Sequence, residues 1–183
     1  MAGERSMKHV KPMALGRALV LAIVLAAAGA HAQSQDADEA SKAFIKTAIQ
    51  GNNAEIELGT LAQGKGQSGA VKQFGQTLVA DHKKANEEAK AAANAVGVKP
   101  PNARLVSIGT MVKLKAESGN AFDRSFIDAM ISDHRKDIKT YEEQSGKNNA
   151  VGQYAKQALP TLQKHLQEAE RIRQQLNDVT GSK

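Results

Sequence analysis

The amino-acid sequence predicts an all-α fold, a four-helix bundle in which the second and third helices are joined by a crossover connection. Four segments carry apolar residues at three- and four-residue spacing, which is the period of one helix face. These segments are rich in Ala, Leu, Glu, Gln and Lys rather than in β-branched residues, a composition that favours helix. No segment shows the alternating pattern of a strand.

The N-terminal segment, residues 1–32, has the features of a cleavable signal peptide. Basic residues precede an uncharged, apolar run over residues 18–30, and Ala30-His31-Ala32 follows with small residues where signal peptidase needs them. The run is shorter than the roughly 20 residues of a membrane-spanning helix. We therefore expect cleavage before Gln33, export to the periplasm or the medium, and a single mature domain over residues 33–183.

The mature chain divides at its glycines and prolines. The four expected helices cover residues 36–63, 68–96, 121–144 and 150–179. Pro160 falls inside the last of them and predicts a kink or a break at Gln157. The connector between the second and third helices is longer than most helix–helix loops, and residues 106–115 predict a short extra helix within it. Ferritin-like bundles have such a crossover, whereas up-down-up-down bundles lack one.

Charge and composition exclude several classes of partner. The net charge is +6, but the leader holds four basic residues and one acidic residue, so the mature chain carries only +3. With 3% aromatic residues there is no stacking platform, and we expect no nucleic-acid binding. The chain has no cysteine, so neither a lipidated cysteine nor a disulfide is available. We expect no transmembrane anchor after processing; protein partners and homo-oligomer formation stay open.

Three histidines are the strongest candidates for chemistry. His82, His134 and His165 each lie on the apolar stripe of a different helix and close to its middle. Antiparallel packing with matched ends would bring them to one height in the core. Glu55 is the acidic residue nearest the middle of the first helix on its inner stripe, and we expect it to be the acidic residue nearest the histidines. Three imidazoles and one carboxylate form a first shell suited to Zn²⁺ or another divalent transition metal.

The second and third helices also repeat a local pattern, an Asp-His-basic-Lys run with a phenylalanine eight residues before the histidine. Asp81 and Asp133 thus precede two of the histidines. Each aspartate would act as a neighbouring ligand, as an outer partner to an adjacent helix, or as a polar flank. Glu168 shares a helix face with His165. The alternative to a metal site is that the histidines are core residues hydrogen-bonded to tyrosine or acidic side chains.

Common catalytic designs are missing from the sequence. There is no glycine-rich phosphate loop, no nucleophile elbow, no H-E-x-x-H motif and no cysteine nucleophile. We therefore expect no enzyme of these types.

Four motifs stand out along the mature chain: Phe44-x-x-x-Ala48-x-x-Gly51-x-x-x-Glu55, Val79-x-Asp81-His82, Gly119-x-x-Phe122-Asp123 and Leu159-Pro160-x-Leu162-x-x-His165. Through these motifs, residues 40–176 resemble an uncharacterised bacterial family. Its members are a domain-of-unknown-function family, often labelled putative or predicted outer membrane proteins. The resemblance implies a ferritin-like helical bundle. Many ferritin-like proteins bind two iron ions through Glu-x-x-His units, but this sequence has no such unit, so we do not expect a di-iron centre.

Two functions from different classes follow from the sequence. The first is an exported bundle that binds a metal, with a role in stress as one option. The second is a structural or interaction bundle whose histidines rigidify the core.

Overall fold

The computed structural model describes residues 18–103 and 108–181, and within these ranges all secondary structure is helical. The five helices are α1 (Ala18–Lys65), α2 (Gly69–Ala95), α3 (Ile108–Ala116), α4 (Gly119–Ser145) and α5 (Ala150–Gly181). The predicted all-α class is confirmed. All the expected helices are present, including the short extra helix in the connector.

Two boundaries differ from the sequence-based expectation. Helix α1 begins at Ala18 rather than near residue 36, because the Ala- and Leu-rich run before it also favours helix. Helix α5 continues through Pro160 without a break. Pro160 is exposed, so water can bond the carbonyl that loses its backbone donor there. Cleavage before Gln33 stays a prediction.

The chain divides into two compact units, Met1–Asp38 and Glu39–Lys183. The second unit holds the core and all the candidate site residues. In the part of the chain that the structure describes, no helix combines the length and the apolar character that a membrane span requires.

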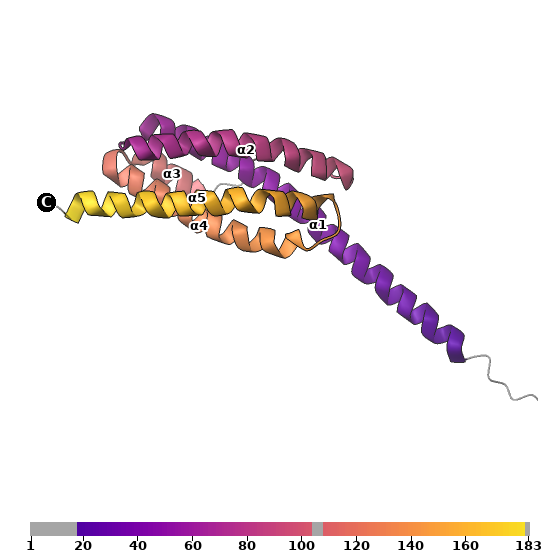
Figure 1. The fold of residues 1–183 in the computed structure, drawn as a ribbon. Coiled ribbons are helices and arrows are strands. Elements are labelled where there is room, and N and C mark those ends of the chain that lie inside the picture. Colours follow the sequence, from indigo (N-terminus) through magenta and orange to yellow (C-terminus); the bar gives the residue numbers. More distant parts are fainter. Residues whose placement is uncertain (1–17, 104–107, 182–183) are drawn as a thin grey trace, which may run out of the picture. The chain divides into compact units, whose positions relative to one another are not determined.

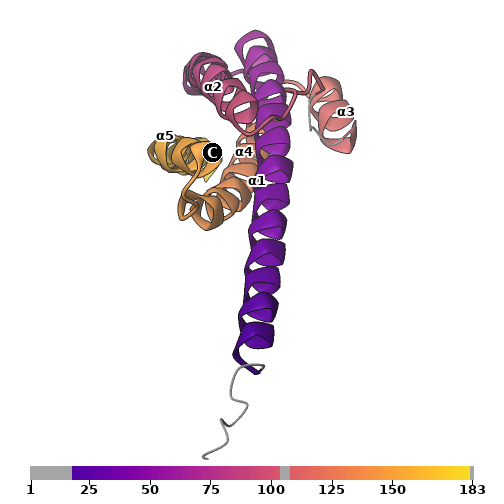
Figure 2. The same cartoon turned by 90° about the vertical axis from the view of Figure 1, so that its right-hand side faces the viewer.

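Within the second unit, the long helices pack into a bundle with α4 and α5 side by side (Figures 1 and 2). Figure 2 shows α3 outside the group formed by α2, α4, α5 and the neighbouring part of α1. Helix α3 packs through Met111 and Leu114, which are buried against the core. Lys65, at the end of α1, donates hydrogen bonds to the carbonyls of Leu114 and Lys115. These are the orphan acceptors that every helix C-terminus leaves.

The core consists of two apolar clusters with buried polar residues between them. The first cluster includes Phe44 and Ile49 of α1, and the second includes Leu58 and Ala62. Along α1 and α5 the chain passes from the first cluster to the second, and along α2 and α4 it passes from the second to the first. Helices α2 and α4 therefore run in the same direction, so the connector between them must return along the bundle.

Buried polar side chains fall between the two clusters in all four long helices. They are Asn52 and Glu55 of α1, His82 and Asn86 of α2, His134 of α4 and His165 of α5. Because each helix passes through both clusters, these residues share one level of the bundle. The prediction that the three histidines lie at the same height in the bundle is thus confirmed.

Helices α1 and α2 approach each other closely at two glycines. A Cβ added at Gly59 would lie 2.7 Å from the carbonyl oxygen of Gly75, and one added at Gly75 would lie 2.6 Å from that of Gly59. Any larger residue at either position would push the helices apart. The N-terminus of α2 is held by Asp123 of α4, whose carboxylate accepts hydrogen bonds from the backbone N–H groups of Gln67 and Ser68 at 2.8 and 2.7 Å.

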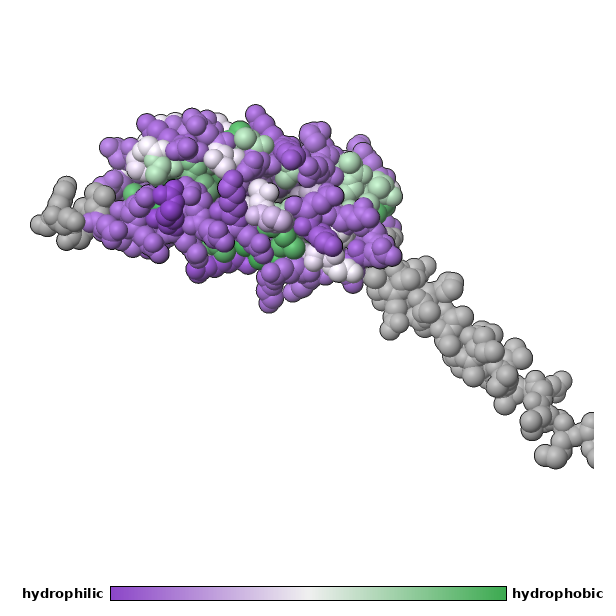
Figure 3. Space-filling view, viewed as in Figure 1, coloured by the Kyte–Doolittle hydropathy of each residue, from purple (hydrophilic) through white to green (hydrophobic). Residues whose placement is uncertain are grey.

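The face of the bundle seen in Figure 3 is mainly hydrophilic, with small separate apolar patches. Among the described residues, Val112 of α3 is the exposed large hydrophobic side chain, at 62% exposure. The polar surface and the buried stripes agree with the amphipathic pattern of the sequence.

Candidate metal centre

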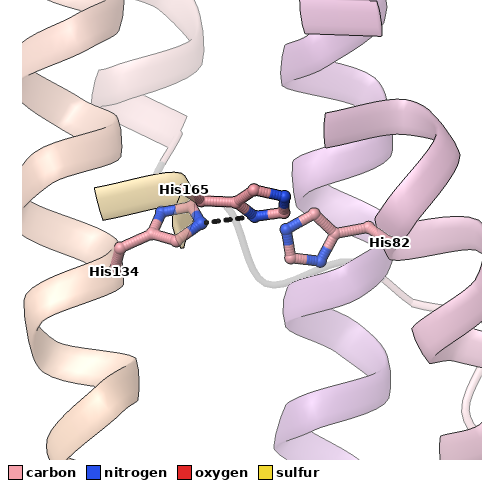
Figure 4. Close-up of side chains that lie close together, drawn as sticks. All are labelled: His82, His134 and His165. Carbon is pink, nitrogen blue, oxygen red and sulfur yellow. Dashed lines mark hydrogen bonds between the residues drawn. The ribbon is translucent and has the colours of Figure 1, made fainter. Parts of the chain in front are cut away.

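His82, His134 and His165 meet in the middle of the bundle (Figure 4). Their ring centroids lie 5.3 to 5.9 Å apart, and one nitrogen from each ring lies within 4.8 Å of the others. All three side chains are buried, with exposures of 4%, 1% and 1%. The sequence placed these three residues together correctly.

Each histidine has one ring nitrogen bonded to an acceptor outside the cluster. His134 Nδ1 donates to the backbone carbonyl of Met130 at 2.9 Å, because a carbonyl can only accept. His165 Nε2 donates to the carboxylate of Asp81 at 2.9 Å. His82 Nδ1 donates to the side-chain oxygen of Asn52 at 3.0 Å. These partners come from α4 itself, from α2 and from α1.

The outer hydrogen bonds fix the tautomer of each ring. With the outer nitrogen protonated, a neutral imidazole carries a lone pair on its inner nitrogen. The inner nitrogens are therefore Nε2 of His82, Nε2 of His134 and Nδ1 of His165. His82 Nε2 is buried without a hydrogen-bond partner, and Figure 4 shows this edge of the ring turned toward His165. His134 Nε2 and His165 Nδ1 lie 3.3 Å apart.

Burial keeps the three rings neutral. Burial and neighbouring His165, opposed by the hydrogen bond to Met130, together lower the pKa of His134 to about 4. Burial also lowers the pKa of His82 well below its ordinary value, with His134 and His165 adding to the effect. The pKa of His165 is lowered by burial, against the opposing effect of Asp81. Only the neutral form of imidazole can bind a metal ion.

The separation of the inner nitrogens suits a metal ion. Two nitrogens bound to one tetrahedral Zn²⁺, each at about 2.0–2.1 Å, lie roughly 3.3–3.4 Å apart. The 3.3 Å between His134 and His165 matches this value. Each ring is also oriented by an outer acceptor, as is usual for histidines that bind metal.

Glu55 lies beside His134 on the outer edge of that ring. Its Oε1 is 4.0 Å from His134 Nδ1, the nitrogen that donates to Met130, and its exposure is 5%. Burial, followed by repulsion from Asp133 and Asp137, raises the pKa of Glu55 well above its ordinary value. The acidic residue nearest the histidines is Asp81, at 2.9 Å, so the expectation that Glu55 would be nearest is wrong. The side chain of Asp81 reaches across to the neighbouring helix, a contact that helical spacing alone does not reveal.

The sequence left the roles of Asp81, Asp133 and Glu168 undecided, and the structure places the three residues in different surroundings. Asp81 is the outer partner of a histidine on an adjacent helix, one of the three roles considered for it. Asp133 lies at the surface, and partial desolvation of its carboxyl by neighbouring atoms raises its pKa. Glu168 pairs with exposed Arg171 one turn later. Glu168 therefore belongs to a surface ion pair rather than to the histidine cluster.

A hydrogen-bonded chain that was not expected from the sequence adjoins the cluster. Asn52 donates through Nδ2 to the hydroxyl of Tyr154 at 3.2 Å, and the hydroxyls of Tyr154 and Tyr141 lie 3.2 Å apart. This chain fixes the orientation of the Asn52 amide, so that its oxygen faces His82. The position of Asn52 at the midpoint of its helix was the available signal, but an isolated asparagine does not identify its partners.

Two cavities reach the cluster. One, of about 390 Å³, is bordered by Asp81, His82, His165, Lys84 and Glu88. The other, of about 580 Å³, is bordered by Glu55, His82, Asp133, Lys136 and Asp137. His82 borders both cavities, and His165 borders the smaller one.

The fold and the site together define a small all-α protein with a three-histidine layer inside a helical bundle. The chain belongs to the family named Domain of unknown function (DUF4142), whose model matches residues 26–172. The expected membership of a domain-of-unknown-function family is confirmed. None of the curated proteins compared with the chain matches it.

A solved structure shows the same kind of fold. The crystal structure of a DUF305 fragment from Deinococcus radiodurans is similar, with a TM-score of 0.68 and 14% sequence identity. The match covers 74% of this chain and 96% of that chain. At this identity the similarity concerns the helical fold alone.

Proposed function

We propose that this protein binds a divalent transition metal ion, with Zn²⁺ as the first choice, through His82, His134 and His165. The observation that carries the proposal is the set of outer acceptors, which fixes the tautomer of each ring. Each outer nitrogen donates to a fixed acceptor, so three lone pairs converge in the core without a proton among them.

A bound cation would pair with the three imidazole lone pairs, which have no hydrogen-bond donor among themselves. A buried polar group without a hydrogen-bond partner costs about 1–3 kcal/mol, and two lone pairs facing each other at 3.3 Å repel. Protonation of a ring would relieve the repulsion, but burial lowers the pKa values of all three histidines. A metal ion accepts all three lone pairs at once.

Nitrogen donors favour Zn²⁺, Cu²⁺, Ni²⁺ or Fe²⁺ over Mg²⁺ and Ca²⁺. Three protein ligands leave at least one position of a tetrahedral ion for a fourth donor. Glu55, the acidic residue proposed from the sequence, is a candidate for that position once its carboxylate turns toward the cluster. We do not propose a di-iron centre, because Glu-x-x-His units do not occur in the sequence.

We also propose the compartment and the finer fold class. The signal peptide predicted over residues 1–32 supports export to the periplasm or the medium. Parallel α2 and α4, joined by a connector that returns along the bundle, support a ferritin-like four-helix arrangement. A metal-binding bundle in this compartment suits a role in metal handling or stress rather than in catalysis, and the outer-membrane label of the family draws no support from the helices.

A structural bundle is the second candidate. The chain from Asn52 through Tyr154 to Tyr141 is a buried hydrogen-bonded network of the kind that fixes a unique core. On this alternative the histidines extend the network, and the stability of the protein does not depend on metal.

Isothermal titration of the untagged, metal-free protein with Zn²⁺ tests the proposal. We expect one ion per chain in the wild type and no such binding in the His134→Ala variant. Addition of Zn²⁺ should raise the melting temperature by mass action, and a chelator should reverse the gain. The absence of binding in the wild type, with equal melting temperatures with and without Zn²⁺, would favour the structural alternative.

A further inference from the structure

The larger of the two cavities beside the histidines is acidic. Asp133, Asp137 and Glu55 border it, with Lys136 as the basic side chain at the same cavity. The smaller cavity is bordered by Asp81 and Glu88 with Lys84. With every carboxyl ionised, the charges sum to −2 around the larger cavity and −1 around the smaller one.

The three carboxylates of the acidic cavity lie at increasing depth. Asp133 is exposed, Asp137 is half-buried and Glu55 is buried at 5% exposure. Glu55 Oε1 is 4.0 Å from His134. The three carboxylates, ordered from exposed to buried, thus extend from the solvent to the edge of the His134 ring.

Glu55, the innermost of the three carboxylates, has one oxygen that accepts no hydrogen bond. Glu55 Oε2 is buried and has no hydrogen-bond partner. At the smaller cavity, by contrast, the carboxylate of Asp81 already accepts a hydrogen bond from His165. A cation entering by the acidic cavity meets a free oxygen close to the histidines.

We infer that the acidic cavity is the route by which a divalent cation reaches the histidine cluster. Asp133 and Asp137 attract the ion at the opening, and Glu55 receives it before the histidines bind it. This inference rests on the proposed function. Acidic openings with low-dielectric walls raise the local concentration of cations and their association rates, and the effect weakens as salt screens the charges.

The test measures the rate of Zn²⁺ binding by stopped-flow competition with a chromophoric chelator. The Asp133→Asn/Asp137→Asn double variant should bind Zn²⁺ at least about threefold more slowly than the wild type at low salt. The difference should shrink at about 0.5 M salt, where the screening length is only a few ångströms. Glu55→Gln, which keeps the side-chain shape, should also slow binding.

Glu88→Gln at the smaller cavity is the matched control and should leave the rate unchanged. Equilibrium titration of the double variant should still give one Zn²⁺ per chain, because neither aspartate is a ligand in the proposal. If wild type and double variant bind equally tightly and equally fast, the access route is wrong while the metal site stands. If the wild type binds no Zn²⁺, both ideas fail together.

Discussion

Asp81 of α2 accepts a hydrogen bond from Nε2 of His165 on α5 at 2.9 Å. This contact links two helices that are distant in sequence and fixes the proton of His165 on the side away from the cluster. Nδ1 of His165 therefore faces His134 with its lone pair.

Replacement of Asp81 by asparagine should weaken metal binding without removing a ligand. The amide can present its N–H groups to His165 and so favour the wrong tautomer. Loss of such an outer partner typically lowers metal affinity about 10- to 100-fold. Competition titration with Zn²⁺ measures the change, and Glu168→Gln, which disturbs only the surface pair with Arg171, is the control. Equal affinities in the Asp81→Asn variant and the wild type would show that the contact does not orient His165.

Stability of the metal-free protein should depend on pH through His134. Its pKa falls from an ordinary value of 6.5 to about 4 on folding, so between these values the unfolded chain binds more protons than the folded chain. The contribution of His134 is therefore fully present above about pH 6.5 and is lost as the pH falls toward 4. Asp137, whose pKa is raised to about 6 by burial, acts in the opposite direction in part of this window.

A comparison with His134→Gln separates these effects, because Asp137 is present in both proteins. Urea unfolding in the presence of chelator, at several values between pH 7.5 and 4, should show the wild type losing stability relative to the variant as the pH falls. Parallel curves for the two proteins would mean that His134 is as easily protonated in the folded state as in the unfolded state.

The close approach of α1 and α2 predicts opposite effects for two glycines. Gly75→Ala places a methyl group 2.6 Å from the carbonyl oxygen of Gly59, and such overpacking costs about 1–3 kcal/mol. Gly64→Ala, in the last turn of α1, meets no atom within 4 Å and should stabilise the protein by up to about 1 kcal/mol through helix propensity. The free energies of unfolding from urea denaturation measure both. A neutral Gly75→Ala would show that the two helices are not held at this distance.

The sequence predicted the features that depend on periodicity. Apolar spacing located the four long helices, although not the start of α1, and the mid-helix position of His82, His134 and His165 was enough to place them together. The sequence pattern could not predict the contacts that the polar ends of the side chains make. Whether Asp81 or Glu55 lies nearest the histidines depends on helix rotation and rotamer choice, and both carboxylates have the right height.

The continuity of α5 at Pro160 was missed for a similar reason. The local rule for proline predicts a kink or a break, yet exposure of Pro160 lets water replace the lost bond. Asn52 was not recognised because one polar residue on an inner stripe has no distinguishing neighbour in sequence. Its role emerges only where α1 meets His82 of α2 and Tyr154 of α5.

X-ray absorption at the zinc edge, on wild-type protein loaded with one equivalent of Zn²⁺, tests the central claim most directly. The account predicts about three imidazole nitrogens at about 2.0–2.1 Å together with the outer-shell scattering of histidine rings. The signal of ordered histidine ligands should be lost in the His134→Ala variant. A zinc shell of oxygen alone, or a spectrum unchanged by that substitution, would contradict the assignment of His82, His134 and His165 as the metal ligands.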